Sequence, residues 1–301
     1  AIEDLTGLRA AIVALGHASP AVLVSENGRS VAATGAKAGA DPATPFGVTI
    51  WPDWQVADAT VAFSDVSQVR FLSNNHVLLW QSPDGGPYAA FVADIRRPTT
   101  RFQFSGYQID TLRVTDSGKW AAMALDGSLS SGQFNPSDIP GSVSGASIPL
   151  SGTIRNLIWR QDGRFLLVER DDTVIVSLRS TDWTAVASIT GGLGPIKGVV
   201  SPVGRDSCFG YQPEVGACTF SVSSGGMLTV SRWPHQIAEE GEVSLSPFRK
   251  FLITKKQVDL GSVNYYYRKT PYATESDVSP SWPSVPQGSR IQQIGWLLWV
   301  P

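Results

Sequence analysis

The sequence predicts an all-β protein in which one four-stranded antiparallel unit recurs along the whole chain. Three observations support this prediction: a low charged fraction with many turn residues, a hairpin signature, and the repetition of that signature at a nearly constant interval. Of the 301 residues, 17% are charged, 29 are Gly and 20 are Pro. Such a composition favours strands and turns over long helices. Only Leu5–Leu15 has the apolar spacing of a helix.

The hairpin signature is clearest between Arg160 and Leu178. Two apolar runs, Phe165–Val168 and Thr173–Leu178, follow a turn that contains Asp162-Gly163. Gly tolerates the positive φ that a tight turn needs, and β-branched residues suit a pleated sheet. We therefore expect a strand hairpin here, with positive φ at Gly163.

Further copies of this hairpin occur along the chain. Each copy has an apolar run, a short polar turn that often contains Gly, a basic residue and a second apolar run. The copies lie at residues 21–35, 69–81, 109–125, 154–170, 196–212, 242–256 and, shortened, 291–301. Their turns at Gly28, Asn75, Gly118, Gly163, Gly204, Arg249 and Gly295 are separated by 47, 43, 45, 41, 45 and 46 residues. A four-stranded propeller blade occupies about 40–45 residues, so this period predicts a closed β-propeller.

The number of blades depends on how the two ends of the chain pair. Third and fourth apolar runs follow the copies, for example at 172–179 and 184–190, whereas the last copy reaches only two strands. Residues 8–15 would supply the missing strand by pairing with the C-terminal copy, which gives seven blades in one domain over 1–301. The alternative is six blades with an N-terminal helix packed outside the ring.

Several turn segments carry a resemblance to known proteins. SPVGR, SPFRKFLI, RQDGRFLLV and DSGKWAAM resemble the S-P-D-G-R-x-L-hydrophobic element of WD40-like and YVTN-like propellers. The resemblance covers nearly the whole chain, although the GH and WD dipeptides of WD40 repeats are absent at the expected positions. Propellers include enzymes, lectins and scaffolds, so the resemblance implies a fold and not a chemistry.

Residue types that catalyse reactions or bind metals form no motif in this sequence. His17, His76 and His235 lie in separate segments, and we expect His76 to be a structural residue at a strand turn. There is no G-x-S-x-G elbow and no D-x-D-x-D-G calcium loop. The neighbouring acids Asp171-Asp172 and Glu239-Glu240 would point to opposite faces of a strand. We therefore expect no catalytic residue, no cofactor and no metal, and a propeller hydrolase is the least favoured function.

The two cysteines, Cys208 and Cys218, flank the turn of another expected hairpin. A disulfide needs its Cβ atoms within about 4.5 Å, and the sequence does not set the strand register. The sequence is therefore compatible both with a Cys208–Cys218 disulfide and with two reduced thiols.

Aromatic residues at turns and three long loops are the candidates for contacts with a partner. The aromatic candidates are Phe46, Trp51, Trp54 and Trp282. The loops at 33–47, 134–147 and 270–289 are rich in Pro, Ser and Gly and longer than ordinary turns. Loops on a rigid scaffold are where binding residues concentrate.

These features favour a non-enzymatic propeller that acts as a protein–protein interaction scaffold or structural assembly component. The few Met, Cys and Lys residues and the abundant Gly, Ser, Thr and Trp suit a bacteriophage virion protein, such as a tail or fibre-base component. The alternative is a lectin-like, carbohydrate-binding propeller. A lectin would repeat equivalent aromatic-plus-acid sets at the blade period, and the sequence shows none.

Charge and hydropathy exclude other partner classes. A net charge of −2 argues against nucleic-acid binding, and the lack of an apolar run of about 18 residues argues against membrane insertion. Glu3 and Asp4 precede any basic residue, unlike the start of a secretory signal. We therefore expect a cytoplasmic or virion-associated protein whose partners are other proteins of a larger assembly, with glycans as the alternative ligand.

Overall fold

The computed structural model describes most of the first 190 residues and the strands that follow them. The described ranges are 17–25, 27–37, 46–54, 60–63, 66, 68–80, 90–98, 101–135, 143–160, 162–171, 174–189, 200–202, 207–212, 216–232, 242–245, 251–259 and 262–269. In residues 17–21, 35–37, 46, 200–221 and 231–269 the description is limited to the backbone. The predicted pairing of residues 8–15 with the C-terminal copy lies outside these ranges.

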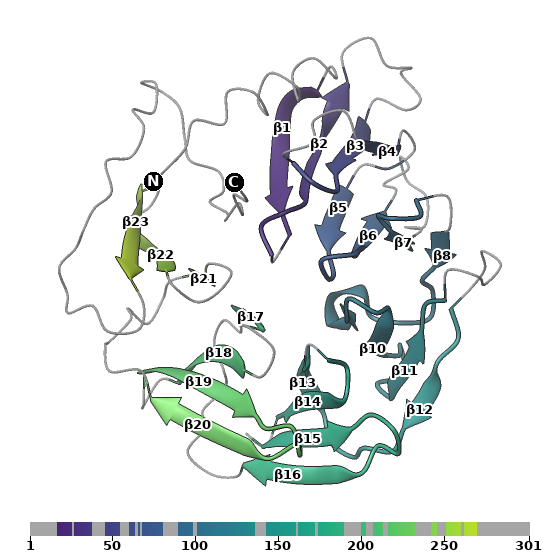
Figure 1. Cartoon of the computed structure of the whole chain (residues 1–301), viewed down its shortest axis with the longest axis vertical. Coiled ribbons are helices and arrows are strands. Elements are labelled where there is room, and N and C mark those ends of the chain that lie inside the picture. The colour runs from purple at the N-terminus through teal and green to yellow at the C-terminus, as the bar shows by residue number, and fades with distance from the viewer. Residues whose placement is uncertain are drawn as a thin grey trace. The chain divides into compact units, whose positions relative to one another are not determined.

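The described part consists of strands and turns, with one 3-10 turn, η1 (Ile109–Thr111), and no α-helix (Figure 1). The first sheet contains β1 (His17–Val24), β2 (Val31–Lys37), β3 (Phe46–Trp51) and β4 (Val61–Phe63). The second contains β5 (Gln68–Phe71), β6 (His76–Trp80), β7 (Ala90–Asp94) and β8 (Arg101–Gln103). The third contains β9 (Arg113–Val114), β10 (Lys119–Met123), β11 (Leu129–Gln133) and β12 (Ala146–Ile148).

The remaining sheets continue the same pattern. The fourth contains β13 (Ile154–Trp159), β14 (Phe165–Arg170), β15 (Ile175–Arg179) and β16 (Ala185–Ile189). The fifth contains β17 (Val200–Pro202), β18 (Ser207–Gln212), β19 (Gly216–Val222) and β20 (Leu228–Arg232). The described strands of the sixth are β21 (Glu242–Leu245), β22 (Phe251–Asp259) and β23 (Ser262–Lys269). In every sheet, strands that are consecutive in sequence are neighbours and antiparallel.

The predicted repeat is confirmed for the copies that the structure describes. The two apolar runs of each copy form the first two strands of a sheet, from β1 and β2 through to β21 and β22. The turn glycines Gly28, Gly118 and Gly163 have φ of 73°, 88° and 67°. Positive φ at Gly163 was predicted from the Asp-Gly turn and is confirmed. The turn markers at 204, 249 and 295 lie outside the described residues.

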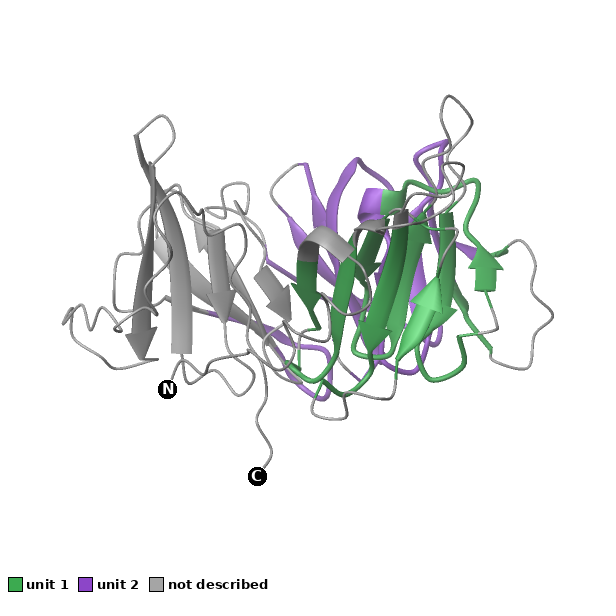
Figure 2. Cartoon of the chain, turned by 90° about the horizontal axis from the view of Figure 1, so that it is seen from above, with its two compact units in different colours: residues 1–109, 132–145, 281–301 green, residues 110–131, 146–280 purple. Residues whose placement is uncertain are grey.

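The chain divides into two compact units (Figure 2). The described residues of 1–109 and 132–145 form unit 1, and those of 110–131 and 146–280 form unit 2. In each unit, neighbouring sheets pack together through their apolar faces. In unit 1 one cluster joins Val48 and Ile50 of the first sheet to Val77 and Leu79 of the second.

Unit 2 is packed in the same way. One of its clusters joins the third and fourth sheets, and another joins Phe165 of the fourth sheet to Val222 of the fifth. In the inner strand β14, Phe165 to Glu169 are all buried, because a sheet covered on both faces has no solvent-exposed side. The first four residues of β14, Phe165–Val168, accordingly form a continuous apolar run.

Candidate functional site

In each of the first four sheets, one end carries the turn between the first and second strands, and in the first, second and fourth sheets this turn lies beside the turn after the third strand. We call this end the turn end. A backbone hydrogen bond joins the two turns in three sheets: Trp54 N–H to Arg29 O at 3.0 Å, Ile95 N–H to Asn75 O at 2.9 Å, and Ser180 N–H to Arg164 O at 2.9 Å. In the second and fourth sheets the bonded residues continue the strand register, whereas in the first sheet the bond is displaced by one residue. Each pair of turns is thereby held as one rigid element.

Hydrogen bonds also join the turn ends of neighbouring sheets within each unit. In unit 1, the Asn27 amide of the first sheet donates to Asn74 Oδ1 of the second at 2.9 Å. In unit 2, Lys119 Nζ of the third sheet donates to Gly163 O at 3.1 Å and to Ser180 Oγ at 2.9 Å in the fourth. The turn end is thus fixed by direct bonds between turns as well as by the apolar core beneath it.

Arginine–aspartate pairs lie at the turn ends of unit 1 and, separately, of unit 2. They are Arg29–Asp53 at 2.9 Å, Arg96–Asp94 at 2.6 Å, Arg179–Asp182 at 3.3 Å, and Arg160–Asp162. The side chains of Arg29, Arg96 and Arg179 are 53%, 55% and 48% exposed. The Arg29–Asp53 and Arg179–Asp182 pairs are at least partly exposed on both sides and contribute little to stability, whereas the side chains of Asp94 and Arg160 are largely buried. The three exposed arginines therefore remain available for contacts with another molecule.

Two of the predicted aromatic residues meet at the turn end of the first sheet, and a third lies elsewhere. Trp51 is 0% exposed and packs against Val31, and Trp54 is half-buried against the same cluster. Phe46 begins β3 and Trp51 ends it, so five steps of about 3.3 Å separate their backbones by about 16 Å. The backbone of Phe46 therefore lies at the other end of β3 from the turn that contains Trp54, and the contact role of both residues stays a prediction. Trp282 lies outside the described residues.

The complete burial of Trp51 changes the role that we assign to it. A side chain with no exposed surface cannot touch a partner without rearrangement. We place Trp51 beneath Trp54 as part of its support, and keep Trp54 as the residue of this pair that reaches the surface.

The long loops fold more closely onto the sheets than the sequence suggested. In the 33–47 loop the β2–β3 pairing continues through Gly35–Gly47 and Ala36–Phe46. This leaves residues 38–45 between the two strands. The 270–289 loop lies outside the described residues.

Both described ends of the 134–147 loop contact the second sheet. Phe134 is 3% exposed, and its ring centroid lies 5.3 Å from that of Phe102. The Val143 amide donates to Gln103 O, and the Gly145 amide donates to Tyr107 Oη, both at 3.0 Å. These parts of the loop are bound within the molecule, so they cover β8 instead of projecting into solvent.

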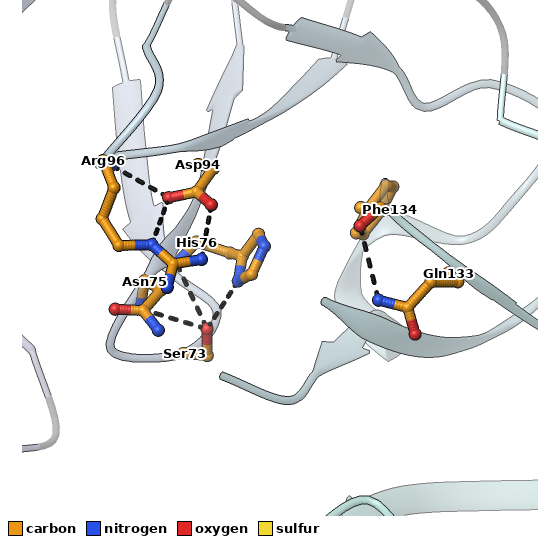
Figure 3. Close-up of polar contacts among 7 residues, drawn as sticks. All are labelled: Ser73, Asn75, His76, Asp94, Arg96, Gln133 and Phe134. Atoms are coloured by element: carbon orange, nitrogen blue, oxygen red, sulfur yellow. Dashed lines mark hydrogen bonds and ion pairs between the residues drawn. The ribbon is translucent and has the colours of Figure 1, made fainter. Parts of the chain in front are cut away.

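Ser73, His76 and Asp94 come together in the second sheet in a set that resembles a catalytic triad in composition (Figure 3). Ser73 Oγ lies 3.1 Å from His76 Nδ1 and also accepts the amides of Asn75 and His76, at 3.3 and 3.2 Å. Ser73 is 8% exposed and His76 is 3% exposed. A nucleophilic serine needs an accessible Oγ whose proton the histidine can remove. This hydroxyl is instead buried and shapes its own turn.

In the same set, both carboxylate oxygens of Asp94 accept hydrogen bonds from Arg96. Its Oδ1 accepts from the Arg96 amide and Nε, both at 2.9 Å, and its Oδ2 accepts from Arg96 Nη2 at 2.6 Å. Burial by itself raises the pKa of Asp94, but the hydrogen bonds from Arg96 and the charges of Arg96 and His76 outweigh it and lower that pKa below 3.8. The carboxylate stabilises the β7 turn. The sequence-based prediction that His76 is a structural residue agrees with this geometry.

The strand register bears on the two cysteines. β18 and β19 form the expected hairpin, with Cys208 opposite Phe220 and Cys218 opposite Gly210. The cysteines therefore occupy diagonal positions, which lie about 7–8 Å apart, whereas the Cα atoms of a disulfide are about 4.4–6.8 Å apart. This register favours two separate thiols over the disulfide, which stays a prediction.

Sequence reasoning missed the arginines of the turn end. Arg29 follows the marker Gly28, and Asp53 comes 24 residues later, so only the fold brings their side chains together. Trp183, which borders a turn in the sequence, has φ of 57°, is half-buried, and packs against Trp159 with ring centroids 6.2 Å apart. The available signal was the basic residue that follows the turn in most copies of the repeat.

The described ranges contain no group of three or more His, Cys, Asp or Glu residues that is arranged to hold a metal ion. The same ranges contain no helix with the length and apolar character needed to cross a membrane.

Comparison with known proteins identifies the fold. No family model and no curated protein matches the sequence. The chain is similar to the β-propeller domain of Cps50 (Swd1) from Myceliophteria thermophila, with 10% identity, a TM-score of 0.55, and 84% of this chain and 83% of that chain covered. It also matches a chain of a mitotic checkpoint complex at 15% identity and a TM-score of 0.46, over 77% of this chain and 70% of that chain.

Together with the four-stranded antiparallel sheets, the similarity to Cps50 shows that the chain has a β-propeller fold. The predicted fold class is therefore confirmed, and so is the resemblance to WD40-like propellers at the level of the fold. At 10% identity this similarity concerns the fold alone.

Proposed function

We propose that this β-propeller is a non-enzymatic scaffold that binds another protein of a larger assembly through the turn ends of unit 1. The observation that carries the proposal is the linked set of turns, which holds exposed arginines and the half-buried Trp54 in fixed positions. Arg and Trp are the side chains that most often dominate the energy of protein interfaces. A surface that is rigid before binding loses little conformational entropy when the partner arrives.

The charge pattern favours a protein partner with mixed charges. In unit 1, Arg29 and Arg96 each have an aspartate beside them, so these pairs produce no strong potential of one sign. A nucleic acid would require a basic stripe. A protein whose own acids and bases alternate would match these pairs and set the orientation of binding.

Two finer functions rest on the sequence alone. The bacteriophage virion role stays a prediction from composition. For carbohydrate binding, the nearest approach to a recurring aromatic-plus-acid set is Asp53-Trp54 and Asp182-Trp183. The Trp54 amide bonds to Arg29 in the neighbouring turn, whereas the Trp183 amide bonds to Arg179 in its own turn, so the two are not equivalent. We therefore place the scaffold before the lectin.

The proposal is tested by capture of partners from the protein's natural source. Three tagged proteins are compared: the wild type, Trp54→Ala, and Leu125→Ala as the matched control. Leu125 is 72% exposed in the turn between β10 and β11, at the end of its sheet opposite the turn end. Circular dichroism establishes that all three are folded, and quantitative mass spectrometry measures the proteins they capture.

We expect a defined set of proteins to be captured by both the wild type and Leu125→Ala. Trp54→Ala should capture at least tenfold less of each protein in this set. Identical capture by all three folded proteins would refute the turn end as the contact surface. Binding of a glycan array by the wild type, abolished by Trp54→Ala, would replace the scaffold with the lectin.

A further inference from the structure

The fourth strands of the five four-stranded sheets differ in how open their edges are. β4, β8 and β12 have three residues each, which limits pairing with another chain. β16 has five residues, but its pairing with β15 shifts register between Ser177 and Leu178, and such a bulge also hinders pairing. β20 has five residues, Leu228–Arg232, and pairs with β19 without a register shift. Of these five strands, β20 has the longest regular edge.

The hydrogen-bond pattern shows which groups of β20 face outward. The Ser223 amide donates to Met227 O at 2.9 Å, which makes this a directly bonded pair. Bonded and non-bonded pairs alternate along an antiparallel ladder, so Thr229 and Ser231 bond to β19. The backbone N–H and C=O groups of Leu228, Val230 and Arg232 consequently point away from the sheet.

The second sheet shows how the molecule treats an outer strand elsewhere. The Phe104 amide donates to Ala90 O at 2.8 Å, so Phe104 and Ala90 are a bonded pair. By the same alternation, the backbone N–H and C=O groups of Gln103 in β8 point away from the sheet. The Gln103 carbonyl accepts the Val143 amide at 3.0 Å. A chain segment therefore already covers the edge of β8, which is shorter than β20.

Two of the three large hydrophobic side chains that are exposed among the described residues lie in the β19–β20 hairpin: Met227 at 58% and Val230 at 37%. The third, Leu125, lies in the β10–β11 turn of another sheet. The hairpin is also held firmly, because Gly226 packs so closely on Phe165 that an added Cβ would lie 2.4 Å from the Phe165 ring. A fixed edge with apolar side chains is suited to pairing with a second strand.

We propose that two copies of this chain associate by antiparallel pairing of β20 with β20 across a two-fold axis at Val230. The outward groups at 228, 230 and 232 are symmetric about Val230, so Val230 pairs with its counterpart and Leu228 with Arg232 of the second copy. Three bonded pairs supply about six main-chain hydrogen bonds. A two-fold interface requires such a self-complementary surface. This dimer is independent of the turn-end scaffold function.

The test measures oligomeric state by native mass spectrometry and by light scattering coupled to size exclusion. Two five-residue strands bury less than the about 1,200 Å² of a stable interface, so we expect a dissociation constant in the micromolar range. Samples therefore span about 1–200 µM. Two variants interrupt the edge. Val230→Pro removes one outward N–H and leaves the β19 bonds in place, and Val230→Lys adds a charge on the axis. Ser188→Lys, on the exposed part of β16, is the matched control.

We expect the wild type and Ser188→Lys to dimerise, and both Val230 variants to raise the dissociation constant at least tenfold while they keep the wild-type circular dichroism. If Val230→Pro unfolds, Val230→Lys alone decides the result, because its side chain starts from an exposed position. A wild type that stays monomeric at 200 µM overturns the proposal. A dimer that persists in both Val230 variants also overturns the proposal, because its interface must then lie elsewhere.

Discussion

A comparison of two glycines tests the packing between the fourth and fifth sheets. Gly226 and Gly127 have nearly the same backbone conformation, with φ of 87° and 86°. Their surroundings differ. A Cβ at Gly226 would lie 2.4, 2.9 and 3.0 Å from three carbons of the Phe165 ring, whereas a Cβ at Gly127 would meet nothing within 4 Å.

The two alanine variants should therefore differ by the cost of the clash. Placing a Cβ in the left-handed region costs about 1–2 kcal/mol, which is the whole expected loss for Gly127→Ala. Overpacking of a filled core costs about 1–3 kcal/mol more. The Phe165 ring is 3% exposed and held between Leu167, Ile175 and Val222, so it cannot move aside freely. We expect Gly226→Ala to lower the free energy of unfolding by about 2–5 kcal/mol.

Urea denaturation of both variants measures these free energies. A third protein, Gly226→Ala with Phe165→Leu, removes part of the ring, and the clash should then shrink, so that the two substitutions are less destabilising together than their sum. Equal losses for Gly226→Ala and Gly127→Ala, or strict additivity in the double variant, would show that Gly226 does not pack on Phe165.

Two further predictions concern single residues. Gly163→Val should destabilise the protein by about 1–3 kcal/mol in thermal or urea unfolding, because Gly163 has φ of 67° and a Cβ would lie 3.4 Å from Thr115 Cγ2; a neutral result would contradict the strained turn. Asp94 has a lowered pKa in the folded state, so its contribution to stability is present above its ordinary value of 3.8 and is lost as the pH falls through the lower folded value. Asp94→Asn should therefore be less stable than the wild type at pH 7, and the difference should narrow as the pH falls from about 5 to about 2; a constant difference would contradict the Arg96 pairing.

The turns of this protein could be predicted from sequence because their chemistry is local. A Gly after polar residues and before a basic residue marks the hairpins at Gly28, Gly118 and Gly163, and the structure gives all three a positive φ. The spacing of these markers then identified the blade period. Neither step needs information from distant parts of the chain.

The contacts between turns could not be predicted in the same way. Trp51 and Trp54 border one turn and looked alike in sequence, yet Trp51 is fully buried because β3 ends with its side chain directed at Val31 and Ala33. The burial of Phe134 against Phe102 depends on how a loop of the third sheet meets the second. Such contacts are set by packing between elements, for which a single sequence carries no local signal.

The cysteine pair illustrates the limit set by register. The hairpin around residues 213–215 was predictable, but a disulfide depends on whether the cysteines are opposite or diagonal. Pairing of Cys208 with Phe220 fixes the diagonal arrangement, and this depends on the whole β18–β19 ladder. A shift by two residues would preserve every inward-facing side chain and change the cysteine chemistry.

The central claim, that the turn end is the binding surface of a propeller scaffold, is tested most directly by amide hydrogen exchange on the free protein and on its native assembly. Exchange should slow on assembly in the turn segments 27–30, 52–54 and 94–98 of unit 1. Unchanged exchange in these segments, with protection at the opposite turns such as 124–128, would contradict the central claim.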